Sequence, residues 1–110
     1  MHSDCLFCAI AEGKTNTRFL YEDDEIVVFK DKYPHRPIHL LIVPKRHIRS
    51  VNDLAPEDLG LVGRMIDRAR LMAKEFKIDQ EGYKLLFNVE RGGDQVIFHL
   101  HLHLLSGRRR

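Results

Sequence analysis

Histidine and apolar side chains alternate along the segment IFHLHLHLLSG, residues 97–107, and this pattern constrains the chain more than any other feature. Strict alternation predicts a β-strand, whose successive side chains point to opposite faces of a sheet. Because each partly buried imidazole needs hydrogen-bond partners, three histidines on one face indicate a functional site. The apolar face, expected to pack under a helix, carries Phe98, Leu100, Leu102 and Leu104, and the other face carries Ile97, His99, His101, His103 and Leu105.

The other apolar segments predict an α+β fold. Strands are expected near residues 18–21, 25–30, 38–43 and 83–89, and residues 96–105 make the fifth. Pro44 is expected to end the third strand, because proline cannot donate to a strand ladder. Residues 5–12 predict a short helix that stops at Gly13. Close spacing within each run of strands indicates hairpins, so we predict a five-stranded antiparallel sheet with one long and one short helix.

The long helix is expected to begin near Pro56, which suits a first helical turn. Apolar residues then recur every three or four positions and predict one stripe that covers a face of the sheet. This stripe consists of Leu59, Val62, Ile66, Ala69, Ala73 and Phe76. Three more apolar residues, Leu61, Met65 and Met72, make the helix apolar on more than one narrow stripe.

Length and composition are those of a small globular protein. With 110 residues, 44% of them hydrophobic, the chain is expected to form one domain over residues 1–110. The net charge of +2 does not suggest a nucleic-acid partner, and we interpret Arg108–Arg110 as a solvated end. The first residues do not resemble a signal peptide, and no apolar run is long enough to span a bilayer. We therefore expect a cytoplasmic protein without membrane contact, in which His2 and His35 have no special role.

Two cysteines stand at metal-binding spacing in the segment CLFC. Cys5 and Cys8 could share one tetrahedral zinc ion, and disulfides rarely persist in the cytoplasm. A thioredoxin-like redox pair would need a βαβ context, which the sequence lacks. The alternatives left open are two free thiols and a zinc site completed by distant ligands, for which His47 and His99 are available.

The chemistry of the histidine row has two interpretations. A His-x-His pair on a strand could hold a catalytic zinc, with a third ligand elsewhere. One imidazole could instead be a nucleophile or an acid–base group that its neighbours orient. The preceding segment NVERGGDQ places Asn88 and a glycine turn before the row, and such a turn can offer backbone N–H groups to an anion. A neutral imidazole can also attack phosphorus, which favours phosphoryl chemistry.

HLHLHLL resembles the signature of the histidine triad family of nucleotide hydrolases and transferases, in which three histidines alternate with apolar residues. FKDKYPHRPIHLLIVPKRHI and YKLLFNVERGGDQ resemble further family segments, so the similarity spans about residues 5–107. The ending LLSGR and the position of Gln95 look most like the Hint branch. The resemblance implies an enzyme that cleaves adenosine phosphoramidates and related nucleotide–amine or nucleotide–acyl adducts, a purine nucleotide substrate such as an AMP adduct, and a homodimer.

The resemblance also implies a role for each matching residue. The middle histidine, His101, is expected to be the nucleophile that forms a nucleotidyl–histidine intermediate, and His103 is expected to contact the phosphate. His99 and His39 are expected to support and orient the row. The nucleotide is expected to contact Asp31 at the ribose with Lys32 beside it, Asn88, Gly93, Asp94, Gln95 and Val96 at the phosphate, and Leu6, Phe7 and Ile10 at the base.

In zinc-containing relatives, the residues matching Cys5, Cys8, His47 and His99 look like a structural zinc site. Such a site would tie the N-terminal segment to the sheet and fix the tautomer of His99. It would stabilise the fold and take no part in the chemistry.

The sequence departs from the family pattern at two positions. Val96 replaces a serine or threonine that is thought to assist the departing amine, which puts the leaving-group preference in doubt. Asp94 stands where glycine is common, and a carboxylate there repels a phosphate unless the side chain turns outward.

Two other functions stay open: a dinucleoside polyphosphate hydrolase like the Fhit branch, and a nucleotide-binding module with little turnover. The SGR ending argues against the Fhit branch, where proline more often follows the triad.

Overall fold

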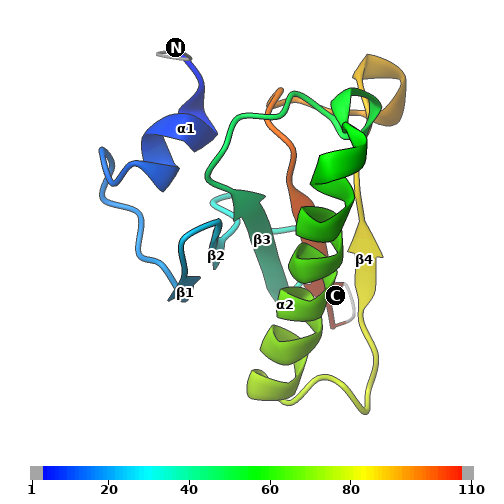
Figure 1. Ribbon diagram of the computed structural model, residues 1–110. Coiled ribbons are helices and arrows are strands. Elements are labelled where there is room, and N and C mark those ends of the chain that lie inside the picture. Colours follow the sequence, from blue (N-terminus) through cyan, green and yellow to red (C-terminus); the bar gives the residue numbers. More distant parts are fainter. Residues whose placement is uncertain (1–3, 108–110) are drawn as a thin grey trace.

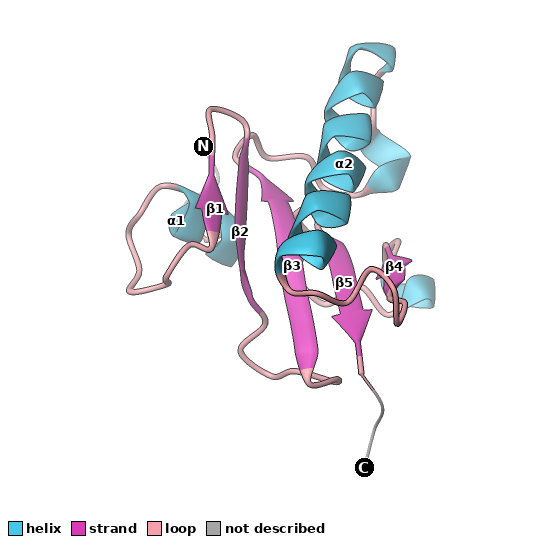
Figure 2. Cartoon of the chain, turned by 90° about the horizontal axis from the view of Figure 1, so that it is seen from below, coloured by secondary structure: helices cyan, strands magenta, loops and turns pink. Residues whose placement is uncertain are grey.

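The computed structural model describes residues 4–107 as an antiparallel sheet with a helix on each face (Figures 1 and 2). The α+β class and the five-stranded sheet with one long and one short helix are therefore confirmed. No helix within these residues is both long and apolar enough to cross a bilayer. His2 and Arg108–Arg110 lie outside the described residues.

In chain order the elements are α1 (Leu6–Ala11), β1 (Tyr21–Glu22), β2 (Ile26–Lys30), β3 (Ile38–Pro44), the 3-10 helices η1 (Val51–Asp53) and η2 (Pro56–Asp58), α2 (Leu59–Glu75), β4 (Lys84–Leu86), the 3-10 helix η3 (Arg91–Gly93) and β5 (Leu102–Ser106).

The sheet places the end of the histidine row at its centre. The strand order is β1-β2-β3-β5-β4, and every neighbouring pair is antiparallel. Leu41 of β3 lies opposite both Phe29 of β2 and His103 of β5. Directly opposed residues share a face, so these three side chains point to the same side of the sheet. His39, two residues from Leu41, points to that side as well.

The last strand is shorter than the predicted 96–105, because β5 begins only at Leu102. Its pairing with β3 ends at Ile42 opposite Leu102, and its pairing with β4 ends at Leu86 opposite His103. The segment before it bonds to the loop after β3 instead, where the N–H of Leu100 donates to the Ile48 carbonyl over 2.6 Å. The strand at 83–89 is likewise reduced to β4. The third strand includes Pro44 as its last residue, one position beyond the prediction.

The two faces of the sheet have separate apolar cores. On the α2 side, Leu100, Leu102 and Leu104 are buried as predicted. Phe98 does not join them: it is half-buried, and the guanidinium carbon of Arg49 lies 4.4 Å from its ring centroid. On the other side α1 packs against β2 and β3, in a cluster of Phe7, Ile10, Ala11, Val27, Phe29, Leu41 and Val43.

The face of α2 that packs on the sheet differs from the predicted stripe. Leu61, Met65 and Met72 are buried, whereas Leu59 is 60% exposed and Ile66 is 44% exposed. The prediction held for Ala69 and Ala73, which are buried. Because α2 is apolar on two adjoining faces, the three-to-four spacing alone could not decide which face meets the sheet.

Candidate functional site

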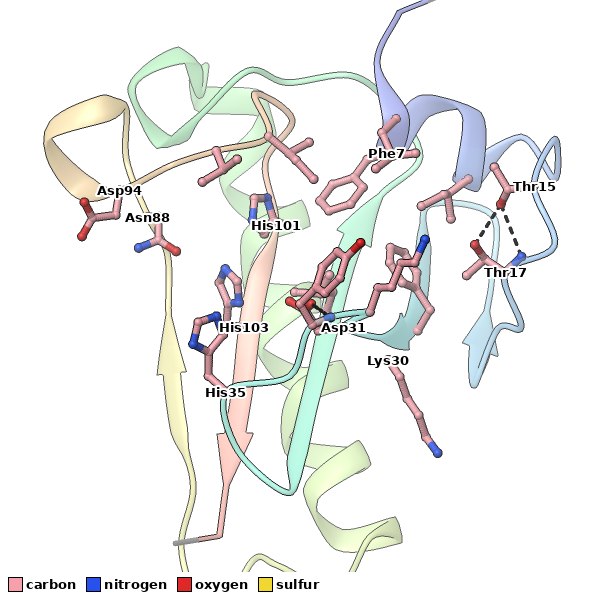
Figure 3. Close-up of a pocket in the computed structure, with 18 of the residues that line it drawn as sticks. Phe7, Thr15, Thr17, Lys30, Asp31, His35, Asn88, Asp94, His101 and His103 are labelled. Carbon is pink, nitrogen blue, oxygen red and sulfur yellow. Dashed lines mark hydrogen bonds between the residues drawn. The ribbon is translucent and has the colours of Figure 1, made fainter. Parts of the chain in front are cut away.

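A cavity of about 890 Å³ opens on the α1 side of the sheet (Figure 3). A volume of this size is within the range of small-molecule sites. The segments around it come from α1, β2 and β3, the loops after α1 and β2, the segment after β4 and the histidine row. Ten of the residues singled out in the sequence line it: Leu6, Phe7, Ile10, Asp31, Lys32, Asn88, Asp94, Val96, His101 and His103. Gly93, Gln95, His39 and His99 are not among the lining residues.

Other lining residues escaped the sequence analysis. Phe29 and Leu41 could have been found, because their alternation in β2 and β3 places them on the same face as His103. The loop residues carried no pattern that distinguishes a cavity wall from an ordinary turn. They are Thr15, Asn16, Thr17, Tyr33 and His35, the last of which we had expected to have no role.

One ring nitrogen of His101 is fixed as a donor. Its Nδ1 lies 2.7 Å from the backbone oxygen of His99, and because a carbonyl only accepts, Nδ1 carries the proton. In the neutral ring Nε2 then keeps a lone pair. Phe7 packs edge-on against this ring, with centroids 4.9 Å apart. Burial lowers the pKa of His101 below its ordinary value, which favours the neutral ring.

A chain of hydrogen bonds also fixes the tautomers of His39 and His103. The backbone N–H of His35 donates to Nδ1 of His39 over 3.1 Å, so the proton of the neutral His39 ring is on Nε2. That Nε2–H donates to Nδ1 of His103 over 2.8 Å, which leaves the proton of His103 on its own Nε2. Within the described residues, this Nε2 is the buried side-chain polar atom without a hydrogen-bond partner. An unpaired donor beside a cavity suits an oxygen of a bound ligand.

Burial keeps the His39 and His103 rings uncharged. It lowers the pKa of His103 to about 4, with the charges of His101 and His39 adding to the effect. Burial lowers the pKa of His39 as well, and the Asp31 carboxylate partly opposes this because it lies 3.3 Å from Nε2 of His39. Both rings are therefore neutral near pH 7 and act as oriented dipoles.

The turn before the histidine row uses most of its own N–H groups. The N–H groups of Gly93 and Gln95 donate to the Glu90 carbonyl, and that of Asp94 donates to Arg91, each over 3.0 Å. These three amides are thus engaged within the turn, and the Val96 N–H is the one among residues 93–96 with no such bond. Of the backbone N–H groups predicted to bind the phosphate, only that of Val96 therefore remains available within residues 93–96.

The side chains of the turn hold it in place. Gln95 is 5% exposed and donates to the carbonyls of Arg49 and Ile97, over 2.8 and 3.1 Å. Asn88 donates to the Gly93 carbonyl over 2.7 Å and still lines the cavity. Figure 3 shows the Asp94 carboxylate directed away from His101 and His103, as a phosphate site would require.

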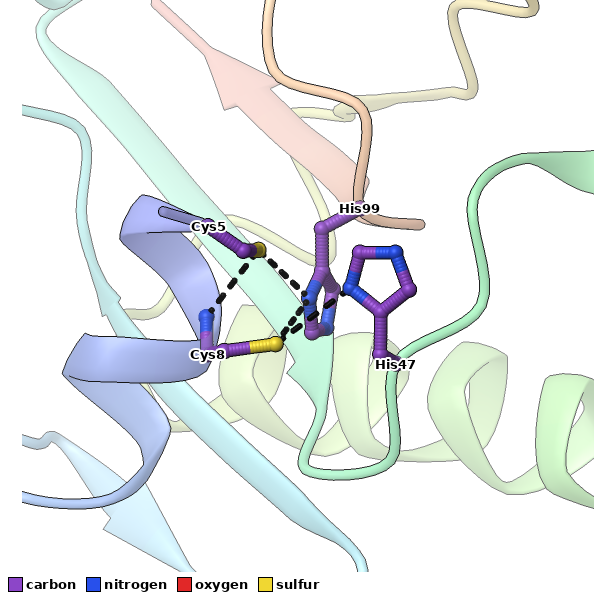
Figure 4. A group of neighbouring side chains, drawn as sticks. All are labelled: Cys5, Cys8, His47 and His99. Carbon is purple, nitrogen blue, oxygen red and sulfur yellow. Dashed lines mark hydrogen bonds between the residues drawn. The ribbon is translucent and has the colours of Figure 1, made fainter. Parts of the chain in front are cut away.

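Four potential metal ligands converge beside the histidine row (Figure 4). Cys5 and Cys8 come from the start of α1, and His47 follows β3. Nδ1 of His99 lies 3.3 Å from Sγ of Cys5 and 3.5 Å from Sγ of Cys8, and Nδ1 of His47 lies 3.3 Å from Sγ of Cys8. All four ligand atoms lie within 4.8 Å of one another. The structure thus brings together the four residues of the predicted set.

The geometry and the surroundings of this cluster fit a tetrahedral ion. Tetrahedral zinc with sulfur and nitrogen ligands separates neighbouring ligand atoms by about 3.3–3.8 Å. Nε2 of His99 lies 2.8 Å from the Pro44 carbonyl and must donate to it, so Nδ1 directs its lone pair at the sulfurs. Burial and the neighbouring Cys5 raise the pKa of the metal-free Cys8 thiol to about 12, so a cation is needed to hold it as a thiolate.

The alternative of a catalytic zinc ion held by two neighbouring histidines of the row is not supported. Among residues 4–107, the groups of side chains close enough to hold a metal are Cys5, Cys8, His47 and His99, and Asp31, His39 and His103, and each contains only one histidine of the row.

Known proteins are similar to this chain over nearly its whole length. Residues 4–109 match the protein family described as "Scavenger mRNA decapping enzyme C-term binding". The purine nucleoside phosphoramidase of Escherichia coli is 37% identical over 108 residues, which cover 98% of this chain and 91% of that protein. A crystal structure of a HIT family hydrolase from Legionella pneumophila is similar with a TM-score of 0.92 and 44% identity, covering 96% of this chain and 94% of that chain.

A solved structure also bears on the cysteine–histidine cluster. It is described as a Zn-bound histidine triad family protein from Mycobacterium smegmatis, and it is similar with a TM-score of 0.82 and 29% identity, covering 99% of this chain and 78% of that chain. The cluster in this chain is a candidate metal site. Taken together with the alternating histidines and the sheet that carries them, these similarities show that the chain belongs to the histidine triad family of hydrolases.

Proposed function

We propose that this protein hydrolyses nucleotide phosphoramidates, in which a purine nucleoside monophosphate is joined to an amine or an acyl group. The observation that carries the proposal is the tautomer of His101. Its Nδ1 proton is held by the His99 carbonyl over 2.7 Å, so Nε2 is the nitrogen with a lone pair for attack on phosphorus. The similarity to a relative named purine nucleoside phosphoramidase supports the choice of substrate class.

The reaction then proceeds in two displacements. In the first, Nε2 of His101 bonds to phosphorus, and the bond from phosphorus to the leaving nitrogen or oxygen breaks. In the second, water attacks phosphorus and the bond to His101 breaks, which releases the nucleoside monophosphate. Charge that develops on the phosphoryl oxygens is stabilised by the unpaired Nε2–H of His103 and by the Val96 N–H.

The remaining cavity residues bind the nucleoside in this proposal. The Asp31 carboxylate accepts hydrogen bonds from the ribose hydroxyls, with Lys32 beside it. Its Oδ1 already accepts from the Tyr33 N–H over 2.8 Å, which fixes the orientation of the carboxylate. The base lies against the apolar wall formed by Leu6, Phe7 and Ile10, which α1 presents to the cavity.

A substrate panel tests this function against its alternatives. We expect the highest kcat/KM for adenosine phosphoramidate or an acyl-adenylate, and a lower value for diadenosine polyphosphates. A preference for the dinucleotides would favour a dinucleoside polyphosphate hydrolase. Tight AMP binding without turnover of any of these substrates would favour a binding module.

The pH profile of kcat/KM follows from the lowered pKa values. The active rings are neutral, and the pKa values of His101 and His103 lie below the ordinary 6.5, that of His103 at about 4. Neutral rings accumulate above these values, so activity persists below pH 6.5 and declines only as the pH falls further. We expect the acid midpoint of the profile below 6.5. A midpoint at or above 6.5 would contradict the neutral, buried nucleophile, provided that activity returns when the sample is brought back to pH 7.

We also propose that the cysteine–histidine cluster holds a structural zinc ion. Cys5, Cys8, His47 and His99 would be its ligands, which closes the tetrahedral shell and leaves no position for a substrate. The ion would join α1 to the segments after β3 and before β5. It would contribute to folding and take no part in the displacement at phosphorus.

The exposed part of α2 supports a homodimer. Leu59 and Ile66 are 60% and 44% exposed, and the half-buried Val62 lies between them at helical spacing. We propose that a second copy of the chain covers these side chains. The double variant Leu59→Glu and Ile66→Glu is then expected to be a monomer at about 10 µM, because burying two carboxylates in an apolar interface costs several kcal/mol.

Light scattering distinguishes the monomer from the homodimer, because their masses differ by a factor of two. Glu75→Lys, at an exposed position near the end of α2, is the matched control and should keep the mass of the wild type. A wild-type protein that is already monomeric at this concentration would refute the proposed dimer.

A further inference from the structure

The departing amine must gain a proton, and the paired histidines cannot supply it. If Nε2 of His103 gave up its proton, the proton on His39 could move across the 2.8 Å bond to replace it. Nδ1 of His39, however, accepts from the backbone N–H of His35 over 3.1 Å, and an amide does not release its proton near neutral pH. The His39–His103 pair therefore orients the Nε2–H donor of His103, but it has no spare proton to transfer to the departing amine.

Several other groups that line the cavity are also unable to supply a proton. Val96, which is 83% exposed, has no ionisable atom. The Asn88 amide is engaged with the Gly93 carbonyl, and the hydroxyls of Thr15 and Thr17 bond to each other over 2.8 Å. Asp31 is oriented by the Tyr33 N–H and lies beside His39, where its negative charge opposes the lowering of that pKa.

The His35 ring is the remaining imidazole at the cavity. It lines the cavity with His101 and His103, and it is exposed, so it can exchange protons with water. Its centroid lies 5.6 Å from that of His39, and its charge acts on His103 as well. Figure 3 shows the His35 ring beside that of His103, on the cavity side of the loop after β2. Imidazole is also the side chain that most readily gives and takes a proton near neutral pH.

We propose that His35 is a catalytic residue, the acid that protonates the departing amine. This inference rests on the proposed phosphoramidase function. As Nε2 of His101 bonds to phosphorus, the phosphorus–nitrogen bond breaks, its electron pair stays on nitrogen, and the His35 imidazolium gives that nitrogen a proton. In the second displacement neutral His35 takes a proton from the attacking water, the bond from His101 to phosphorus breaks, and the imidazolium is restored. Protons and electrons balance over the cycle without a further reactant.

The test compares leaving groups. An adenosine phosphoramidate of an alkylamine needs a proton on its leaving nitrogen, whereas the p-nitrophenyl ester of AMP releases a stable phenolate that does not. For His35→Gln we expect kcat/KM on the alkylamine substrate to fall by about 10²-fold or more. On the p-nitrophenyl ester we expect kcat/KM, which reports only the first displacement, to change by less than about threefold. His35→Ala should behave in the same way, because the backbone N–H that bonds to His39 is retained.

A control variant and the wild-type activity distinguish a failure of the His35 role from a failure of the phosphoramidase function. Arg36→Gln removes a neighbouring cation that does not line the cavity, and it should leave the ratio of the two rates unchanged. If the wild type is active but His35→Gln slows both substrates equally, or slows neither, His35 is not the acid and the phosphoramidase function stands. If the wild type cleaves neither substrate, both proposals fail together.

Discussion

Replacing His101 by alanine is expected to reduce the turnover of an adenosine phosphoramidate by at least about 10⁴-fold, because no nucleophile then lies next to phosphorus. AMP should still bind within a few-fold of the wild-type affinity. Its contacts in this account are with Asp31, the apolar wall from α1 and the His103 donor, and none of these contacts is made by the His101 ring. Steady-state kinetics and calorimetric titration with AMP measure the two effects separately.

His103→Asn is the matched comparison, because an amide can still donate to a phosphoryl oxygen while the nucleophile is intact. We expect a smaller loss, on the order of 10²-fold, as for the removal of one donor to a developing oxyanion. A His101→Ala protein that retains near-normal turnover would contradict the assigned nucleophile. So would a larger loss from His103→Asn than from His101→Ala.

Replacing Cys5 by serine should remove zinc and stability together. A serine hydroxyl does not substitute for a thiolate in a site of this kind, and the binding free energy of structural zinc contributes directly to folding. Loss of about 3 kcal/mol or more corresponds to a fall in Tm of roughly 10 °C or more for a domain of this size. We expect about one zinc ion per chain in the wild type and almost none in the variant, measured by elemental analysis beside calorimetry.

Ala9→Ser is the control for the cysteine variant. It places a hydroxyl on α1 at a half-buried position that is not part of the cluster, and it should keep both the zinc content and most of the stability. Cys8→Ser should reproduce the effect of Cys5→Ser. Wild-type protein without zinc, with both thiols titratable in the folded state, would refute the metal site.

The metal cluster and the proposed nucleophile are joined through one residue. The ring of His99 faces the two sulfurs, while its backbone oxygen holds the Nδ1 proton of His101. Phe7 packs edge-on against both rings, with centroids 6.0 Å from His99 and 4.9 Å from His101. Whatever fixes α1 and the His99 backbone therefore also fixes the orientation of the His101 ring.

Alternation in the sequence predicted which side chains share a face, but it did not predict where the strand begins. Leu100 and His101 point to opposite sides as expected, although neither belongs to β5. Extended backbone alternates whether or not it is paired, and the pairing depends on where β3 and β4 turn away. Those turns are set by tertiary contacts, such as the bond from Leu100 to the Ile48 carbonyl, which a local pattern does not contain.

The site residues that lie in family-like motifs could be predicted from the sequence. Those in loops could not, because their position at the cavity depends on how each loop folds. The four metal ligands are separated by up to 94 positions, and the resemblance grouped them before the structure did. His35 was set aside because a histidine between two prolines in a loop has no pattern of its own. The backbone of residues 93–96 was expected to hold the phosphate, whereas three of its four N–H groups close the turn itself.

The most direct test of the account is to trap the covalent intermediate. The enzyme is mixed with a labelled adenosine phosphoramidate, quenched within the first turnover at alkaline pH to preserve the phosphorus–nitrogen bond, digested and mapped by mass spectrometry. The account predicts one adenylyl group on the peptide that contains the histidine row, with fragment ions that place it on His101 and no adduct in His101→Ala. An adduct on His103, or rapid wild-type turnover with no adduct on any histidine, would contradict the proposed mechanism.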